Sequence, residues 1–151
     1  MGELQAHKLT GVALRLFWVI LAIYSMLIIW AFMPVQGSGL KQALGVAFLP
    51  AVGVLAALGV AELLVVLRAG LKDKPLNIFL CMVALATIGT PASIVLHNVV
   101  SYLAGAWFGA PEEGFFFILA LFICPLLFIT GSIGVIHSLM NGNGSGVHSR
   151  S

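Results

Sequence analysis

Hydrophobic residues follow one another in four long stretches, and polar or helix-breaking residues are confined to the segments between them. About 20 consecutive apolar residues form a helix long enough to cross the hydrocarbon core of a membrane. The stretches therefore predict four membrane helices, over residues of about 12–33, 43–67, 77–104 and 115–139. Turn-forming and charged residues separate them, in "PVQGSG", "RAGLKDKPLN" and "GAPEEG".

The composition of the chain points to lipid as its solvent. Of the 151 residues, 61% are hydrophobic and 8% are charged, which leaves too little polar surface to cover a water-soluble globule. We therefore predict an all-α fold, a four-transmembrane-helix bundle in which residues 1–140 form a single integral membrane domain in the lipid bilayer. The glycine- and serine-rich tail over 141–151 is predicted to be disordered.

Positive charges predict the orientation, because Lys and Arg collect on the cytoplasmic side of membrane proteins. With the N-terminus inside, Lys41 alone lies outside, and the other six of the seven basic residues are cytoplasmic: Lys8, Arg15, Arg68, Lys72, Lys74 and Arg150. Both termini are therefore predicted to be cytoplasmic, in a plasma (inner) membrane. The basic residues are scattered, so the sequence indicates no nucleic-acid partner.

The sequence carries no sign of catalysis. It contains no nucleophile elbow, zinc-protease, phosphate-loop or dinucleotide-binding motif. Cys81 and Cys124 lie inside apolar stretches without the spacing of a redox or metal-binding motif, so both are expected to be free, buried thiols. We expect no enzyme, no cofactor and no metal site.

Small residues in two of the predicted helices are typical of close helix packing. Ala43, Ala47 and Ala51 recur at every fourth position, as do Gly53, Ala57 and Ala61, and the last helix adds Gly131, Ser132 and Gly134. Ordinary use of alanine and glycine in a membrane helix explains either row about equally well.

A candidate inner polar group lies near the predicted cytoplasmic side, formed by Arg15, Glu62 and His137. The helices over 43–67 and 115–139 each contain a proline, then Gly-Val nine residues on, then Glu62 or His137 twelve residues on. We predict that Glu62 contacts Arg15 or His137. The alternatives are that Arg15 reaches the headgroups while Glu62 ties the first two helices together, that His137 meets water, or that the group handles protons or ions.

A candidate outer polar face runs along the predicted helix over 77–104. At 100° per residue its polar side chains share one side of the helix: Thr87, Thr90, Ser93, His97, Asn98 and Ser101. These residues suit hydrogen bonds between helices or the lining of a small polar cavity.

A clasp is predicted where this face ends. His97 and Asn98 are expected to face the bundle interior, and the glycines that follow let the chain turn so that Glu112 and Glu113 approach them. The glutamates would also complement the dipole of the last helix, and His97 with two carboxylates would also suit a divalent cation, although a second histidine is lacking nearby.

These features favour a protein that acts by interaction, as an accessory or structural subunit of a membrane assembly, with a protein partner or a second copy of itself. The alternative is a small oligomeric transporter or channel for an ion or small polar solute. A transporter would direct the outer polar face at an aqueous cavity, whereas a subunit would direct it at neighbouring helices.

Overall fold

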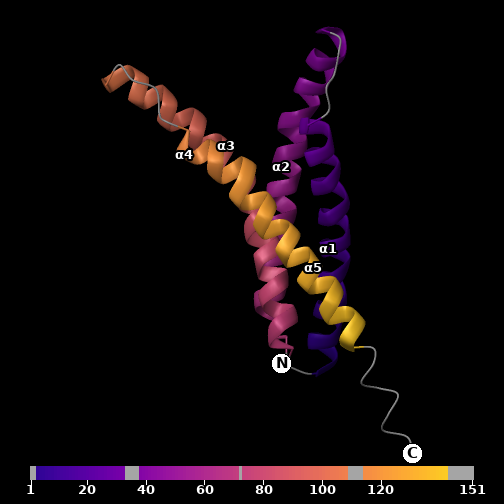
Figure 1. Ribbon diagram of the computed structural model, residues 1–151. Coiled ribbons are helices and arrows are strands. Elements are labelled where there is room, and N and C mark those ends of the chain that lie inside the picture. The colour runs from indigo at the N-terminus through magenta and orange to yellow at the C-terminus, as the bar shows by residue number, and fades with distance from the viewer. Residues whose placement is uncertain (1–2, 33–37, 72, 109–113, 143–151) are drawn as a thin grey trace, which may run out of the picture.

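Four long helices make up the described part of the chain, which comprises residues 3–32, 38–71, 73–108 and 114–142 of the computed structural model (Figure 1). The first three are α1 (Glu3–Phe32), α2 (Ser38–Ala69) and α3 (Lys74–Phe108). The fourth runs through three segments, α4 (Phe115–Ile118), the π-helical turn η1 (Leu119–Ile123) and α5 (Cys124–Gly142). The predicted all-α fold of four helices is confirmed.

Each of these helices contains a segment that is long and apolar enough to cross a membrane. By length and composition the segments are His7–Ile29, Pro50–Ala69, Lys74–Trp107 and Phe115–Asn141. The helices extend beyond the predicted apolar stretches at several ends, because polar residues continue a helix once it has left the hydrocarbon core. The tail predicted to be disordered overlaps α5 at residues 141–142, and its residues 143–151 lie outside the described residues.

The turn between α2 and α3 follows from the local sequence. Gly70 adopts a left-handed backbone conformation with φ of 54°, which ends α2 and is accessible to glycine at little cost. Asp73 then begins α3, since its side-chain oxygen accepts a hydrogen bond from the backbone N–H of Leu76 at 3.3 Å. Pro75 lies in the first turn, where its missing N–H removes no helical hydrogen bond.

Helix α3 is the centre of the bundle. It packs against α2 on one side and against α5 on the other, and α2 in turn packs against α1. Figure 1 shows that α1 begins and α5 ends at the same end of the bundle, whereas at the opposite end α4 and the last part of α3 lean away from α1 and α2. The helices therefore enclose an open angle at that end. Which end faces the cytoplasm stays a prediction.

Glycines permit the closest approaches to α3. A Cβ at Gly59 of α2 would lie 3.0 Å from the side chain of Thr87, and a Cβ at Gly131 of α5 would lie 3.1 Å from the carbonyl oxygen of Phe79. At Gly134 an added Cβ would fall on the Phe79 ring itself. Of the two interpretations left open by the sequence, close packing therefore holds for these two glycines of the last helix. In α2 the row that begins at Gly53 differs, since Gly53 is exposed with no atom of another helix within 4 Å of its added Cβ.

The fourth helix widens just before its proline. In η1 the backbone N–H of Cys124 bonds to the carbonyl oxygen of Leu119, five residues earlier, instead of four as in an α-helix. Pro125, which follows directly, has no N–H to donate. A π-helical turn is a common way to accommodate such an interruption. Pro91 lies inside α3, so the two helices that lean away from α1 and α2 both carry a proline (Figure 1).

Candidate functional site

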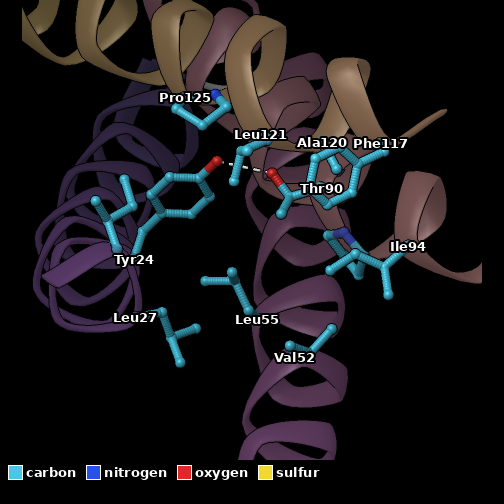
Figure 2. Close-up of a pocket in the computed structure, with 12 residues that line it drawn as sticks. Tyr24, Leu27, Val52, Leu55, Thr90, Ile94, Phe117, Ala120, Leu121 and Pro125 are labelled. Atoms are coloured by element: carbon cyan, nitrogen blue, oxygen red, sulfur yellow. Dashed lines mark hydrogen bonds between the residues drawn. The ribbon is translucent and has the colours of Figure 1, made fainter. Parts of the chain in front are cut away.

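Tyr24 of α1 is a buried polar side chain that contacts two other helices. It is 2% exposed, and its hydroxyl lies 2.7 Å from Oγ1 of Thr90 on α3 (Figure 2). Thr90 donates to the carbonyl oxygen of Ala86 at 3.1 Å, so Tyr24 is the donor in its bond to Thr90. The Tyr24 ring also stacks on Phe128 of α5, with centroids 4.0 Å apart and planes inclined by 16°. One side chain therefore joins three helices.

Tyr24 was missed as a site residue in the sequence analysis. It lies within the apolar segment "LFWVILAIYSMLIIW", where its aromatic ring attracts no notice. A buried tyrosine hydroxyl nevertheless requires a hydrogen-bond partner, and a row of threonines on another helix can supply one. That requirement is the feature of the sequence that could have identified Tyr24 as a site residue.

A cavity of about 190 Å³ lies beside this hydrogen bond, at the open end of the bundle. Figure 2 shows it between Leu27 of α1, Leu55 of α2, Ile94 of α3 and the side chains of the fourth helix. Its lining is almost entirely apolar, and the polar groups at its edge are the two hydroxyls that bond to each other. The cavity does not provide a polar path.

The first half of the predicted polar face of α3 points into the bundle. Thr87 is fully buried and donates to the carbonyl oxygen of Val83 at 2.7 Å, and Ser93 is 2% exposed. Cys124 of α5 is buried against α3, where a Cβ added at Gly89 would lie 3.0 Å from its sulfur. The hydroxyls of Thr87 and Thr90 are thus engaged within the protein. Both cysteines are free, as expected, although Cys81 is partly exposed.

The polar residues in the second half of that face do not all point the same way. His97 is half-buried, and its ring centroid lies 6.1 Å from that of Phe117 on α4. Asn98 is exposed and donates to the carbonyl oxygen of Ile94 in its own helix at 2.7 Å, so the prediction that it faces the interior is wrong. The next residue along a helix is rotated by about 100°, which takes Asn98 off the packed side. Ser101 is half-buried.

The clasp with Glu112 and Glu113 stays a prediction, because both glutamates lie outside the described residues. Within the described part of the chain, no group of three or more His, Cys, Asp or Glu side chains is arranged to hold a metal ion. The ring contact with Phe117 places His97 against the helix that follows the glutamates.

The inner polar group does not assemble. Glu62 is fully buried, and neither carboxyl oxygen has a hydrogen-bond partner among the described residues. Arg15 is exposed, and so is His137, whose Nε2 lies 3.2 Å from Nδ2 of Asn141. The predicted contact of Glu62 with Arg15 or His137 is therefore wrong. The three residues were matched by depth, but Glu62 points into the packed core while the other two point out of it.

A second hollow was not predicted. A groove of about 390 Å³ runs between α1 and α5, with Leu21 and Ser25 on one wall and Ile129, Ser132 and Ile136 on the other. Ser132 is 5% exposed, and its hydroxyl has no hydrogen-bond partner within the described part of the protein. A buried hydroxyl left without a partner costs about 1–3 kcal/mol.

The helices and their apolar surfaces give the architecture of a small multi-pass membrane protein. No protein-family model, no characterised protein and no solved structure matches the chain.

Proposed function

We propose that the protein acts by interaction in the membrane, as an accessory or structural subunit of a membrane assembly. The groove between α1 and α5 receives one transmembrane helix of a partner protein. The proposal includes the plasma membrane as the location, with both termini in the cytoplasm as the distribution of Lys and Arg predicts.

The observation that carries this proposal is the buried hydroxyl of Ser132 on the wall of the groove, which has no hydrogen-bond partner among the described residues. Lipid acyl chains fit an apolar groove equally well, but they carry no group that can bond to a hydroxyl. A partner helix with a serine, threonine or asparagine at this depth supplies such a group, and hydrogen bonds of this kind join helices in membranes. The aliphatic side chains on both walls, such as Leu21 and Ile129, supply the packing surface.

The oligomeric transporter or channel has less support. It would require the polar face of α3 to line a water-filled path. Thr87 and Thr90 instead donate to carbonyls of their own helix, and the cavity beside Thr90 is lined by apolar side chains. These contacts favour a packing role for that face.

A crosslinking experiment in intact cell membranes tests the proposal, with a photoreactive amino acid at Ile136 or at Leu127. Ile136 lines the groove and is 37% exposed, whereas Leu127 is 38% exposed and does not line it. The two positions lie nine residues apart, on opposite sides of α5. We expect a discrete adduct from position 136 and none from position 127.

Variants of Ser132 make the result specific. Ser132→Leu fills the groove and should abolish the adduct, and Ser132→Ala, which removes the hydroxyl but keeps the space, should weaken it. Equal adducts from both positions, or an adduct that survives Ser132→Leu, would refute the proposal. An adduct with the mass of two copies of this chain would show that a second copy, and not a different partner protein, occupies the groove.

A further inference from the structure

Glu62 is an acidic side chain in the middle of a packed apolar core. It lies within the membrane-spanning segment Pro50–Ala69 and is 0% exposed, and both carboxyl oxygens lack a hydrogen-bond partner among the described residues. One helical turn before it, Gly59 is in close contact with Thr87 of α3. The carboxyl is thus held on the side of α2 that is packed against other helices.

An ionised carboxylate in this place is unfavourable. Removing a carboxylate from water without a partner costs several kcal/mol even after the protein relaxes. A metal ion would need further ligands, and the described residues contain no cluster of three or more His, Cys, Asp or Glu that could hold one. A proton neutralises the carboxyl without any additional ligand.

Among the described residues, the helices packed against α2 contribute no buried positive charge beside Glu62. On α3, Cys81 is partly exposed and its thiol carries no positive charge, Lys74 is exposed, and His97 lies toward α4. On α1 the positively charged or titratable side chains His7, Lys8 and Arg15 are exposed, and the Tyr24 hydroxyl is engaged with Thr90.

We propose that Glu62 is a proton-binding site within the membrane span. Its carboxyl holds one proton while α2 is packed on its neighbours, and it releases the proton when that packing opens and water reaches the site. Packing of the bundle and proton uptake are then coupled. This inference does not depend on the proposed partner helix, because Glu62 does not line the groove between α1 and α5.

The proposed coupling fixes the direction in which the stability of the packed protein changes with pH. An exposed glutamic acid is ionised at neutral pH, so the opened protein binds one proton fewer at this site than the packed protein. Stability must then fall as pH rises, by up to tenfold in the folding equilibrium constant for each pH unit over the range in which only the packed protein keeps the proton. Glu62→Gln, which preserves the shape and cannot ionise, should lose this dependence.

The first measurement is an infrared spectrum of the full chain in maltoside micelles at about pH 7, where exposed carboxyl groups are ionised. We expect the carbonyl stretch of a protonated carboxylic acid in the wild type. It should be absent from Glu62→Gln and retained in Asp73→Asn, a matched change at an exposed acid. A wild-type spectrum without this band would overturn the proposal, whether or not Glu62→Gln folds.

The second measurement is unfolding by sodium dodecyl sulfate from about pH 6 to about pH 9. Relative to Glu62→Gln, the wild type should lose stability as the pH rises, and Asp73→Asn should keep the wild-type slope. Parallel curves for the wild type and Glu62→Gln would show that no proton is released on opening, and the coupling would be wrong.

Discussion

Replacing Gly134 by alanine tests the packing of α5 against α3 most directly. The added methyl group would lie 2.6 Å from Cδ2 of Phe79 and closer still to Cγ and Cδ1. Because it meets several ring atoms, a small rotation of the ring cannot make room, and either Phe79 must leave its rotamer or the two helices must separate. Overpacking of this kind costs about 1–3 kcal/mol.

Alanine also forms helices better than glycine, by about 1 kcal/mol in water, so the raw effect of Gly134→Ala underestimates the packing cost. Gly53→Ala is the matched control, since it makes the same change inside a helix where no atom lies within 4 Å of the new Cβ. The difference between the two variants cancels the backbone contribution. We expect Gly134→Ala to be less stable than Gly53→Ala by about 1–3 kcal/mol.

Unfolding of the purified protein by sodium dodecyl sulfate in mild-detergent micelles measures both variants, with circular dichroism and tryptophan fluorescence as readouts. Phe79→Leu provides a second check, because removing the ring should reduce the cost of Gly134→Ala by at least about 0.5 kcal/mol, as expected for residues in contact. If Gly134→Ala proved as stable as Gly53→Ala, the close approach of α5 and α3 at this level would be refuted.

Three further predictions concern the rest of the bundle. Tyr24→Phe should lower the free energy of unfolding by about 0.5–1.5 kcal/mol through loss of the hydrogen bond to Thr90. Tyr24→Leu should lower it further, because it also removes the stacking on Phe128. The same unfolding assay measures both variants, and equal stability of the wild type and Tyr24→Phe would contradict the hydrogen bond. In a cysteine-free background, single cysteines at positions 37 and 112 should react with an impermeant reagent from outside and one at position 72 from inside, and labelling of position 72 from outside would reverse the topology. His97→Ala and Glu113→Gln should each weaken the fold modestly and non-additively if the clasp exists, whereas strictly additive effects would argue against it.

The number of helices could be predicted because a membrane imposes a length that hydropathy alone reveals. The breaks were equally readable, since Gly70, Asp73 and Pro75 each have a local role in ending α2 or beginning α3. Neither kind of evidence depends on how the helices pack. Both follow from the chain and the thickness of the bilayer.

The rotation of each helix about its axis could not be predicted in the same way. In water, the buried side of a helix is apolar and the other side is polar, but in a bilayer both sides are apolar. Ile20 is fully buried while its neighbour Val19 is 47% exposed, although both are aliphatic, β-branched side chains. Likewise, a Cβ added at Gly59 would meet Thr87 of α3 and one added at Gly53 would meet no other helix, although both glycines occur in the same small-residue segment of α2.

Polar residues are the remaining marker of the side of a helix that faces the protein interior. How well they mark that side depends on whether the residue can form its hydrogen bonds within its own helix. Threonine and asparagine can donate to a carbonyl four residues earlier in their own helix, and that bond forms equally for buried Thr87 and for exposed Asn98. Their polarity therefore does not determine where they point, which is why the predicted face of α3 was correct for Thr87 and wrong for Asn98. An ionised carboxyl has no hydrogen to donate to a carbonyl, so the backbone around Glu62 cannot compensate for its burial. The proton proposed for Glu62 supplies this compensation. The sequence indicated the depth of Glu62 and left a proton role open as one alternative, but only the fold shows that its two oxygens have no hydrogen-bond partner among the described residues.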